Sequence, residues 1–162
     1  MPHPERLSLQ QLLLGLIAAF SFANAALADG DKRTTRAPHL SAYQQECAAC
    51  HTAYPPGMLP AASWNRVMGN LNKHYGADAS LDPATVNELS TWLAANAGTY
   101  KRVREEPPQD RLTLSAWFVG KHREVPAPAW KRPAVKSAAN CAACHPQADK
   151  GDFNEHSIRI PL

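Results

Sequence analysis

Cysteine is scarce in this chain, and it occurs only in two short segments. All four cysteines of the 162 residues fall within residues 47–50 and 141–144, so no thiol is left over for a disulfide elsewhere. No stretch shows the alternation of apolar and polar residues that predicts a β-sheet, which argues against the strand-to-helix setting of a thioredoxin-type site. These absences favour a mainly α protein.

An excess of charge of one sign is also lacking. The formal net charge is only +3, and the basic residues are scattered without interleaved aromatic side chains. This pattern argues against a nucleic-acid-binding surface. It also says little about any other partner, because the net electrostatic field is modest.

Long hydrophobic runs are lacking except near the N-terminus. Arg6 precedes an apolar stretch at residues 12–22, and the sequence ALA at residues 26–28 follows as a small-residue cleavage site. The stretch is short for a membrane-spanning helix, so we expect a cleaved signal peptide at residues 1–28 rather than a membrane anchor. The mature chain is then expected in the periplasm, exported and soluble, without a membrane span.

Two copies of the pattern C-x-x-C-H stand out in the remaining sequence, at residues 47–51 and 141–145. This spacing is the attachment site of a c-type haem, because two thiols bind the vinyl groups of one porphyrin and the adjacent imidazole reaches the iron. The sequence therefore predicts two covalently bound haem c groups, each with its iron. The expected attachment residues are Cys47, Cys50, Cys141 and Cys144, and the expected proximal iron ligands are His51 and His145.

Three other interpretations of the cysteine pairs are weaker. The two cysteine pairs of a zinc ribbon lie about 15–20 residues apart, whereas most of this chain separates the two motifs. A redox-active cysteine pair belongs in an α/β fold, which the sequence does not predict. Structural disulfides would leave the repeated histidine without a reason.

The first half of the mature chain predicts a helical haem domain at residues 29–105. We expect one helix at residues 41–51, a second opened by Pro60, and a third with Asp82 as N-cap and Pro83 in its first turn. The second helix carries an apolar stripe at helical spacing, formed by Trp64, Val67, Met68, Leu71, His74 and Tyr75.

Glycines mark where these two helices are expected to end. Gly76 follows the apolar stripe of the second helix, and Gly98 follows the apolar face of the third. Glycine is common just beyond a helix C-terminus, so the sequence predicts that the second helix continues up to Gly76.

The second half predicts a small, irregular C-terminal haem domain at residues 106–162. The charged stretch at residues 99–111 contains two prolines and marks the expected boundary. The expected elements are one or two helical turns at residues 115–122, an extended segment at 125–133, an attachment helix at 137–145 and a returning tail at 151–162. Phe153, Ile158 and Ile160 in the tail are candidates to cover the second haem.

Each iron needs a second axial ligand unless its site is open. Outside the motifs, the mature chain offers four histidines and two methionines: His39, His74, His122, His156, Met58 and Met68. His74 is favoured for the first haem because it lies on the apolar stripe, and His122 for the second because it follows two aromatic residues. A methionine ligand at the first haem remains an alternative, and it would raise the reduction potential.

Five segments of the mature chain carry a resemblance to a known protein family. They read ECAACHTAYPPGMLPAASW at residues 46–64, HYGADASLDPAT at 74–85, WFVGKHREV at 117–125, NCAACH at 140–145, and GDF followed by IRIP in the tail. Together they resemble the small periplasmic dihaem cytochromes c of the DHC type. Met58 is a small departure, because leucine is expected there.

The resemblance implies an N-terminal domain similar to class I cytochromes c and a small C-terminal haem domain of its own type. It also implies that both haems are bis-histidine, with His51 paired to His74 and His145 paired to His122. Its members pass electrons to a small oxygen-binding monohaem cytochrome c, often beside a membrane cytochrome b, so redox partner proteins of these kinds are expected.

The leading hypothesis is a low-potential electron carrier and not an enzyme. The alternatives are a peroxidase-like enzyme with one open iron and a haem-based sensor whose distal ligand is displaced by a gas, with His122 as the candidate. Seven basic residues form either a docking rim for a partner or an ordinary solvated surface. They are Lys101, Arg102, Arg104, Lys121, Arg123, Lys131 and Arg132.

Overall fold

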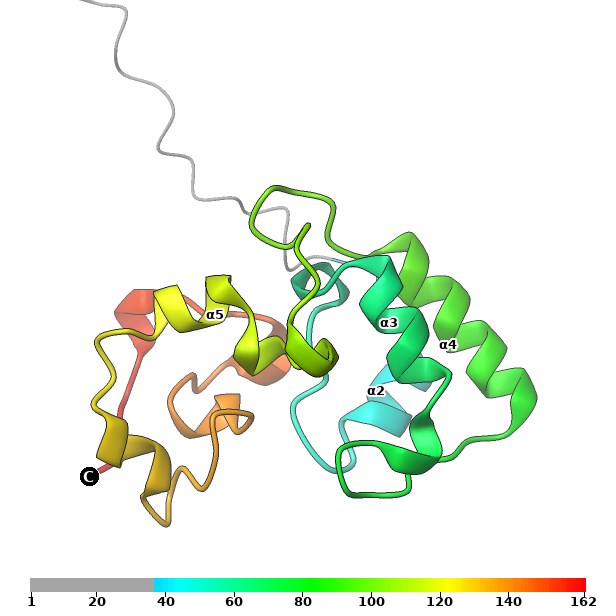
Figure 1. Cartoon of the computed structure of the whole chain (residues 1–162). Coiled ribbons are helices and arrows are strands. Elements are labelled where there is room, and N and C mark those ends of the chain that lie inside the picture. The colour runs from blue at the N-terminus through cyan, green and yellow to red at the C-terminus, as the bar shows by residue number, and fades with distance from the viewer. Residues whose placement is uncertain (1–36) are drawn as a thin grey trace, which may run out of the picture. The chain divides into compact units, whose positions relative to one another are not determined.

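Helices and short 3₁₀ turns make up the computed structural model, which describes residues 37–162 (Figure 1). These residues contain no strand, and their isolated backbone bridge joins His74 to Ala77. The predicted mainly α fold class is therefore confirmed. The predicted signal peptide at residues 1–28 lies outside the described residues. None of the described helices is long and apolar enough to cross a membrane.

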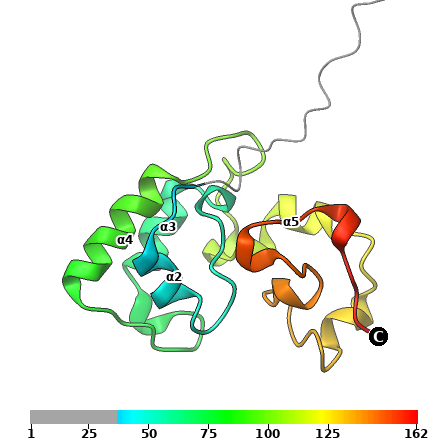
Figure 2. The same ribbon diagram turned by 180° about the vertical axis from the view of Figure 1, so that it is seen from behind.

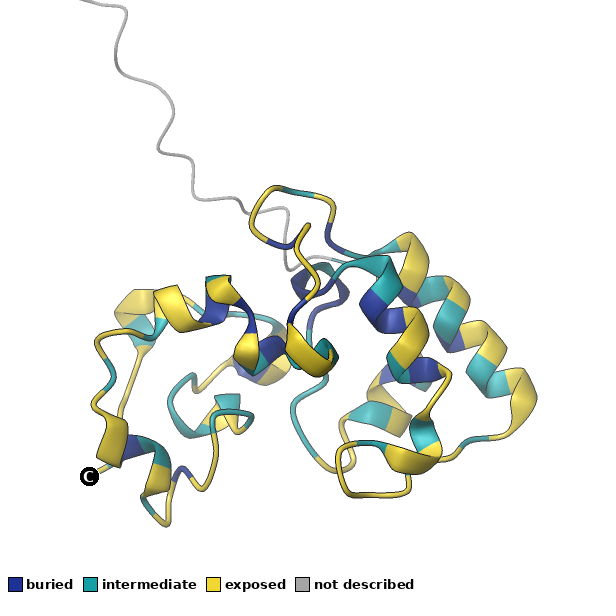
Figure 3. Cartoon of the chain, in the orientation of Figure 1, coloured by how far each residue is buried: buried dark blue, intermediate teal, exposed yellow. Residues whose placement is uncertain are grey.

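Three α-helices build the first half of the described chain: α2 at Ser41–Cys47, α3 at Ala61–Met68 and α4 at Pro83–Ala95. Helices α3 and α4 pack against each other and lie side by side in both ribbon views (Figures 1 and 2). Their buried faces are seen in Figure 3. The core cluster consists of Tyr43, Met58, Leu59, Trp64, Met68, Leu89, Leu93 and Leu112.

Helix α4 begins as the sequence predicts. The Asp82 carboxylate accepts hydrogen bonds from the backbone N–H groups of Ala84 and Thr85, both at 3.0 Å, and Pro83 occupies the first turn. These bonds satisfy N–H groups that have no partner within the helix. The helix ends at Ala95, where the Asn96 side chain donates to the Trp92 carbonyl at 2.8 Å, slightly before Gly98.

The second predicted helix is shorter than expected, and this part of the prediction is wrong. Helix α3 ends at Met68, and the apolar stripe continues only through a 3₁₀ turn, η2 at Leu71–Lys73. Gly69 and the non-helical Asn70 (φ −138°) interrupt it. Glycine is a poor helix former, so the helix stops at this point although the apolar spacing continues. The first predicted helix likewise ends at Cys47 rather than at residue 51.

The second half of the described chain is built from short elements. They are η3 at Pro108–Asp110, η4 at Leu112–Leu114, α5 at Ala116–Lys121, η5 at Ala127–Lys131, η6 at Cys141–Ala143, η7 at Ala148–Lys150 and η8 at Glu155–Ser157. The Ser115 hydroxyl caps α5 by accepting a hydrogen bond from the Phe118 N–H at 3.0 Å. The prediction of one or two helical turns in this region is confirmed.

Two predictions in this half are wrong. Residues 125–133 are not uniformly extended, because η5 forms there with Pro126 as its N-cap and proline in its first turn, where the missing N–H costs nothing. Residues 137–145 do not form an α-helix. Lys136 has a left-handed backbone (φ 66°), and the Asn140 side chain donates to the Val135 carbonyl at 3.1 Å, so only η6 forms.

The C-terminal tail returns to the second motif, as predicted. The Arg159 N–H donates to the Cys144 carbonyl at 2.9 Å, and the Arg132 guanidinium donates to the Pro161 carbonyl at 2.5 Å. Lys121 on α5 pairs with Glu155 at 2.8 Å. The tail is therefore connected to the motif, to the residue after η5 and to α5.

Gly98 occupies a position with no room for a side chain. A Cβ atom there would collide with the Gly57 carbonyl oxygen and lie 2.6 Å from Cγ1 of Val103. The Gly98 N–H donates to the Leu59 carbonyl at 2.8 Å, which holds the backbone in place. We expect Gly98→Ala to lower the free energy of unfolding by about 1–3 kcal/mol, the usual cost of overpacking. Denaturant unfolding of the holoprotein measures this.

Gly120→Ala is the matched control. Gly120 lies in α5, and a Cβ atom at this position has no neighbour within 4 Å. Alanine favours a helix more than glycine by up to about 1 kcal/mol, so this variant is expected to be as stable as the original or more stable. Equal losses in the two variants would contradict the steric explanation.

Candidate functional site

The first motif faces His74. The rings of His51 and His74 have centroids 6.1 Å apart and planes inclined by 14°. The His51 Nδ1 atom lies 2.7 Å from the Thr52 carbonyl, to which it donates, and the Tyr54 ring stacks on His51 with its centroid at 5.0 Å. The bond at Nδ1 leaves Nε2 of His51 as the ring nitrogen available to a metal ion.

The second motif faces His122. The rings of His145 and His122 have centroids 6.2 Å apart, and their planes are inclined by 80°. The His122 Nδ1 atom donates to the Phe118 carbonyl at 2.8 Å, and the Phe118 ring stacks on His122 at 4.0 Å. The Phe153 ring of the tail lies 5.3 Å from His145, and Ile158 and Ile160 are 40% exposed. Coverage of the second haem by these three residues stays a prediction.

Both histidine pairs have the spacing that one metal ion between them requires. A metal–imidazole bond is about 2 Å long and the ring centre lies roughly 1 Å beyond the nitrogen, so two rings on opposite sides of one ion have centres about 6 Å apart. The observed separations are 6.1 and 6.2 Å. The Nδ1 atom of His145 is buried without a hydrogen-bond partner among the described residues. The residues present therefore fit two haem groups.

The four motif cysteines are unpaired. Burial is the main reason that the pKa of Cys47 and that of Cys141 are each raised to about 11, so these thiols are neutral at physiological pH. Among residues 37–162, no three His, Cys, Asp or Glu side chains are placed to hold a bare metal ion. The zinc-ribbon and disulfide interpretations therefore gain no support.

Burial also favours the neutral form of two of the paired histidines. It lowers the pKa of His74, with the adjacent His51 as the next cause, and it lowers the pKa of His145, with the adjacent His122 as the next cause. Only the neutral imidazole has a lone pair for a metal ion. The two sites therefore favour the protonation state that haem iron requires.

The other candidate ligands lie elsewhere. His39 and His156 are exposed, and neither is in ring contact with a motif histidine. Met58 and Met68 are buried in the core cluster with Trp64 and the leucines of α4. His74 and His122 are the candidates that the structure brings to the two motifs.

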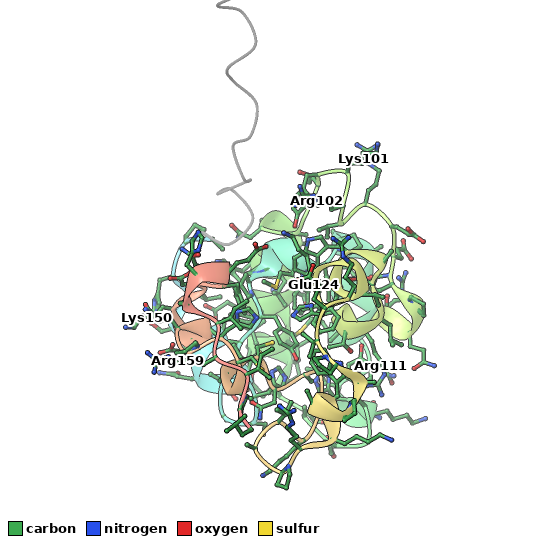
Figure 4. The ribbon with its side chains drawn as sticks, turned by 90° about the vertical axis from the view of Figure 1, so that its left-hand side faces the viewer. Lys101, Arg102, Arg111, Glu124, Lys150 and Arg159 are labelled. Carbon is green, nitrogen blue, oxygen red and sulfur yellow. The ribbon has the colours of Figure 1, made fainter. Side chains whose placement is uncertain are left out.

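The seven basic residues of the predicted docking rim differ in their contacts, because some of them bind other groups of this chain. Lys121 pairs with Glu155, Arg123 lies 3.8 Å from Glu124, and Arg132 donates to the tail. Lys101 and Arg102 project outward from the loop after α4, while the labelled Lys150 and Arg159 lie on a different side of the view (Figure 4). A role of these residues in docking stays a prediction.

Sequence reasoning missed the residue that connects the two motifs. The Tyr54 ring stacks on His51, and its hydroxyl donates to the Ala139 carbonyl at 3.0 Å, just before the second motif. The Tyr43 hydroxyl in turn donates to the Tyr54 carbonyl at 2.5 Å. The sequence signal was the short distance of Tyr54 from His51, but nothing in it indicated a contact 85 positions away.

A helical chain with two haem-attachment motifs, each facing a second histidine, belongs to the class of multihaem c-type cytochromes. The family model described as "Dihaem cytochrome c" matches residues 43–153. The chain belongs to the dihaem cytochrome c family, whose members carry two c-type haems with iron and transfer electrons.

Solved structures agree with this assignment. A dihaem cytochrome c from Shewanella baltica OS155 is 36% identical with a TM-score of 0.67, and the match covers 76% of this chain and 94% of that one. A dihaem cytochrome c from Rhodobacter sphaeroides is 39% identical with a TM-score of 0.62, covering 69% and 94%. A structure of DHC purified from the same organism is 38% identical with a TM-score of 0.63, covering 73% and 100%. No curated protein matches the sequence.

Proposed function

We propose that this chain is a low-potential electron carrier with two bis-histidine haems. His51 and His74 are the axial ligands of the first iron, and His145 and His122 are those of the second. The thioether bonds are formed by Cys47, Cys50, Cys141 and Cys144. When bound, the two haems supply reversible one-electron oxidation and reduction.

The spacing of the two histidine pairs carries the proposal. Two pairs in different parts of the chain have ring centroids 6.1 and 6.2 Å apart, close to the separation of two imidazoles that share one metal ion. An iron with an open sixth position would need only the histidine of its own motif, without a second histidine facing it. Two histidine ligands also favour a lower potential than a histidine and a methionine.

The protein groups around the ligands hold them in place and adjust their basicity. The Nδ1–H groups of His51 and His122 donate to backbone carbonyls, which fixes both ring orientations and makes Nε2 a stronger electron donor to the iron. A more strongly donating ligand stabilises the oxidised iron, which supports a low reduction potential.

The proposal includes the location and partners of the protein. The N-terminal sequence features of a signal peptide and the covalent attachment of haem favour export to the periplasm. A small oxygen-binding monohaem cytochrome c and a membrane cytochrome b are the proposed redox partners, on the basis of the family resemblance.

A carbon monoxide titration of the dithionite-reduced protein tests the proposal directly. Two irons with firm histidine ligands are expected to leave the visible spectrum unchanged. A haem count by the pyridine haemochrome method, together with the mass of the intact chain, should first give two haems per chain. Rapid carbon monoxide binding at either iron would contradict the proposal and favour a sensor or an enzyme.

A further inference from the structure

The residue that follows His74 is held by a segment far along the chain. The Tyr75 hydroxyl donates to the carbonyl oxygens of Gln109 and Asp110 at 3.1 and 3.0 Å, 34 and 35 positions later. The Arg111 guanidinium lies over the Tyr75 ring, 4.2 Å from its centroid. We call residues 106–111 the connector. It fixes both the hydroxyl and the ring of the Tyr75 side chain.

The connector is itself fixed to helix α3. Arg66 donates to the two carboxylate oxygens of Asp110 from Nε at 2.9 Å and from Nη2 at 2.7 Å, and Nη2 also donates to Glu106 at 2.5 Å. A guanidinium that meets a carboxylate through two parallel hydrogen bonds fixes direction as well as distance. Arg66 is half exposed, so its main effect is on geometry rather than on global stability.

The backbone at these contacts adopts an uncommon conformation. Tyr75, Gln109 and Asp110 all have positive φ angles, of 52°, 58° and 55°. Side-chain-bearing residues rarely adopt this region unless the surrounding structure enforces it. Because the Tyr75 hydroxyl bonds to the carbonyls of the other two residues, the three conformations support one another.

The two distal histidines are held differently. His122 has a hydrogen bond from its own ring to the Phe118 carbonyl, whereas no ring nitrogen of His74 bonds to another described residue. The His74 ring contacts Tyr75 at 4.9 Å, and both residues line an open cavity of about 450 Å³. Among the described residues, Tyr75 is the residue other than His51 whose ring contacts His74, so it is placed to support that ring from the side.

We propose that Tyr75, held by Arg66 and Asp110 through the connector, is the positioning residue of His74, and that loosening it admits a small neutral ligand such as carbon monoxide to the first iron. This inference rests on the proposed ligation of the first haem by His74. In the exchange, His74 gives up its bond to iron and moves aside, and carbon monoxide forms one bond in its place. No electron is transferred.

The test uses the mature protein with both haems, reduced with dithionite and mixed with carbon monoxide in a stopped-flow spectrometer. Tyr75→Phe removes only the hydroxyl, and Arg66→Ala removes the two hydrogen bonds from the guanidinium to the Asp110 carboxylate. Each is expected to raise the rate of carbon monoxide binding at one of the two haems by about two- to tenfold, the factor that loss of one hydrogen bond provides. The double variant should bind carbon monoxide only slightly faster than Tyr75→Phe, because both changes act through the same contact.

Lys121→Ala is the matched control, because it also removes an exposed ion pair, with Glu155, but near the second motif. It should leave the rate unchanged. Rates in Tyr75→Phe and Arg66→Ala that stay as low as in the original protein, while His74→Ala binds rapidly, would overturn the inference but not the proposed function. Rapid binding by the original protein would instead contradict the proposed function. If Tyr75→Phe fails to accumulate, the half-exposed Arg66→Ala decides the question.

Discussion

Replacing His74 with alanine is expected to open one of the two irons and leave the other closed. The substitution removes the imidazole whose centroid lies 6.1 Å from that of His51, and alanine offers no replacement ligand. The oxidised variant should show high-spin features for about half of its haem, and the reduced variant should bind about one carbon monoxide per two haems. Visible absorption and a carbon monoxide titration measure both effects.

His122→Ala should produce the same stoichiometry at the other iron, and the double variant should bind carbon monoxide at both. His156→Ala is a suitable control, because it removes an exposed histidine outside both pairs. Both haems should remain covalently attached in every variant, since the four cysteines are unchanged. A His74→Ala protein that stays fully low-spin would show that another residue is the ligand.

The oxidised protein is expected to give two different low-spin electron paramagnetic resonance signals. The ring planes of His51 and His74 are inclined by 14°, and those of His145 and His122 by 80°. Near-parallel imidazoles separate two iron d orbitals in energy and produce a rhombic signal. Near-perpendicular imidazoles leave those orbitals almost equal in energy and produce a strongly anisotropic signal with one large g value.

Low-temperature spectra of the oxidised protein measure this difference, and His74→Ala and His122→Ala assign each signal by removing it. Phe118→Leu provides a finer check. The Phe118 ring stacks on His122 at 4.0 Å with an angle of 23°, so its loss should alter the anisotropic signal and leave the rhombic signal unchanged. Two identical rhombic signals would contradict the observed ring orientations at the second site.

The parts of the structure that depend on local sequence were predicted well. The start of α4 follows from Asp82 and Pro83, and α5 follows from Ser115, because a capping side chain bonds to N–H groups only two or three positions away. The attachment segment at residues 137–145 was predicted wrongly as a helix. There the side chain of Asn140 and the left-handed Lys136 outweigh the favourable helix propensity of the alanines.

The candidate site could be predicted only in part. Each motif is contiguous, so the sequence alone identifies its attachment residues, and the apolar or aromatic surroundings of His74 and His122 favour them as second ligands. The support of His74 was not predictable, because Tyr75 contacts residues 34 and 35 positions away. The charged connector resembled a domain boundary, and only the fold brings its Asp110 to Arg66.

Tyr54 limits how freely the two halves of this chain can be exchanged with those of relatives. Its ring stacks on the histidine of the first motif, and its hydroxyl donates to the Ala139 carbonyl beside the second. A chimera that joins the first half of this chain to the second half of a distant relative preserves both attachment motifs but must also recreate this contact. The second half must therefore bring the backbone carbonyl of residue 139 to the Tyr54 hydroxyl, so conservation of the two motifs alone does not make the halves interchangeable.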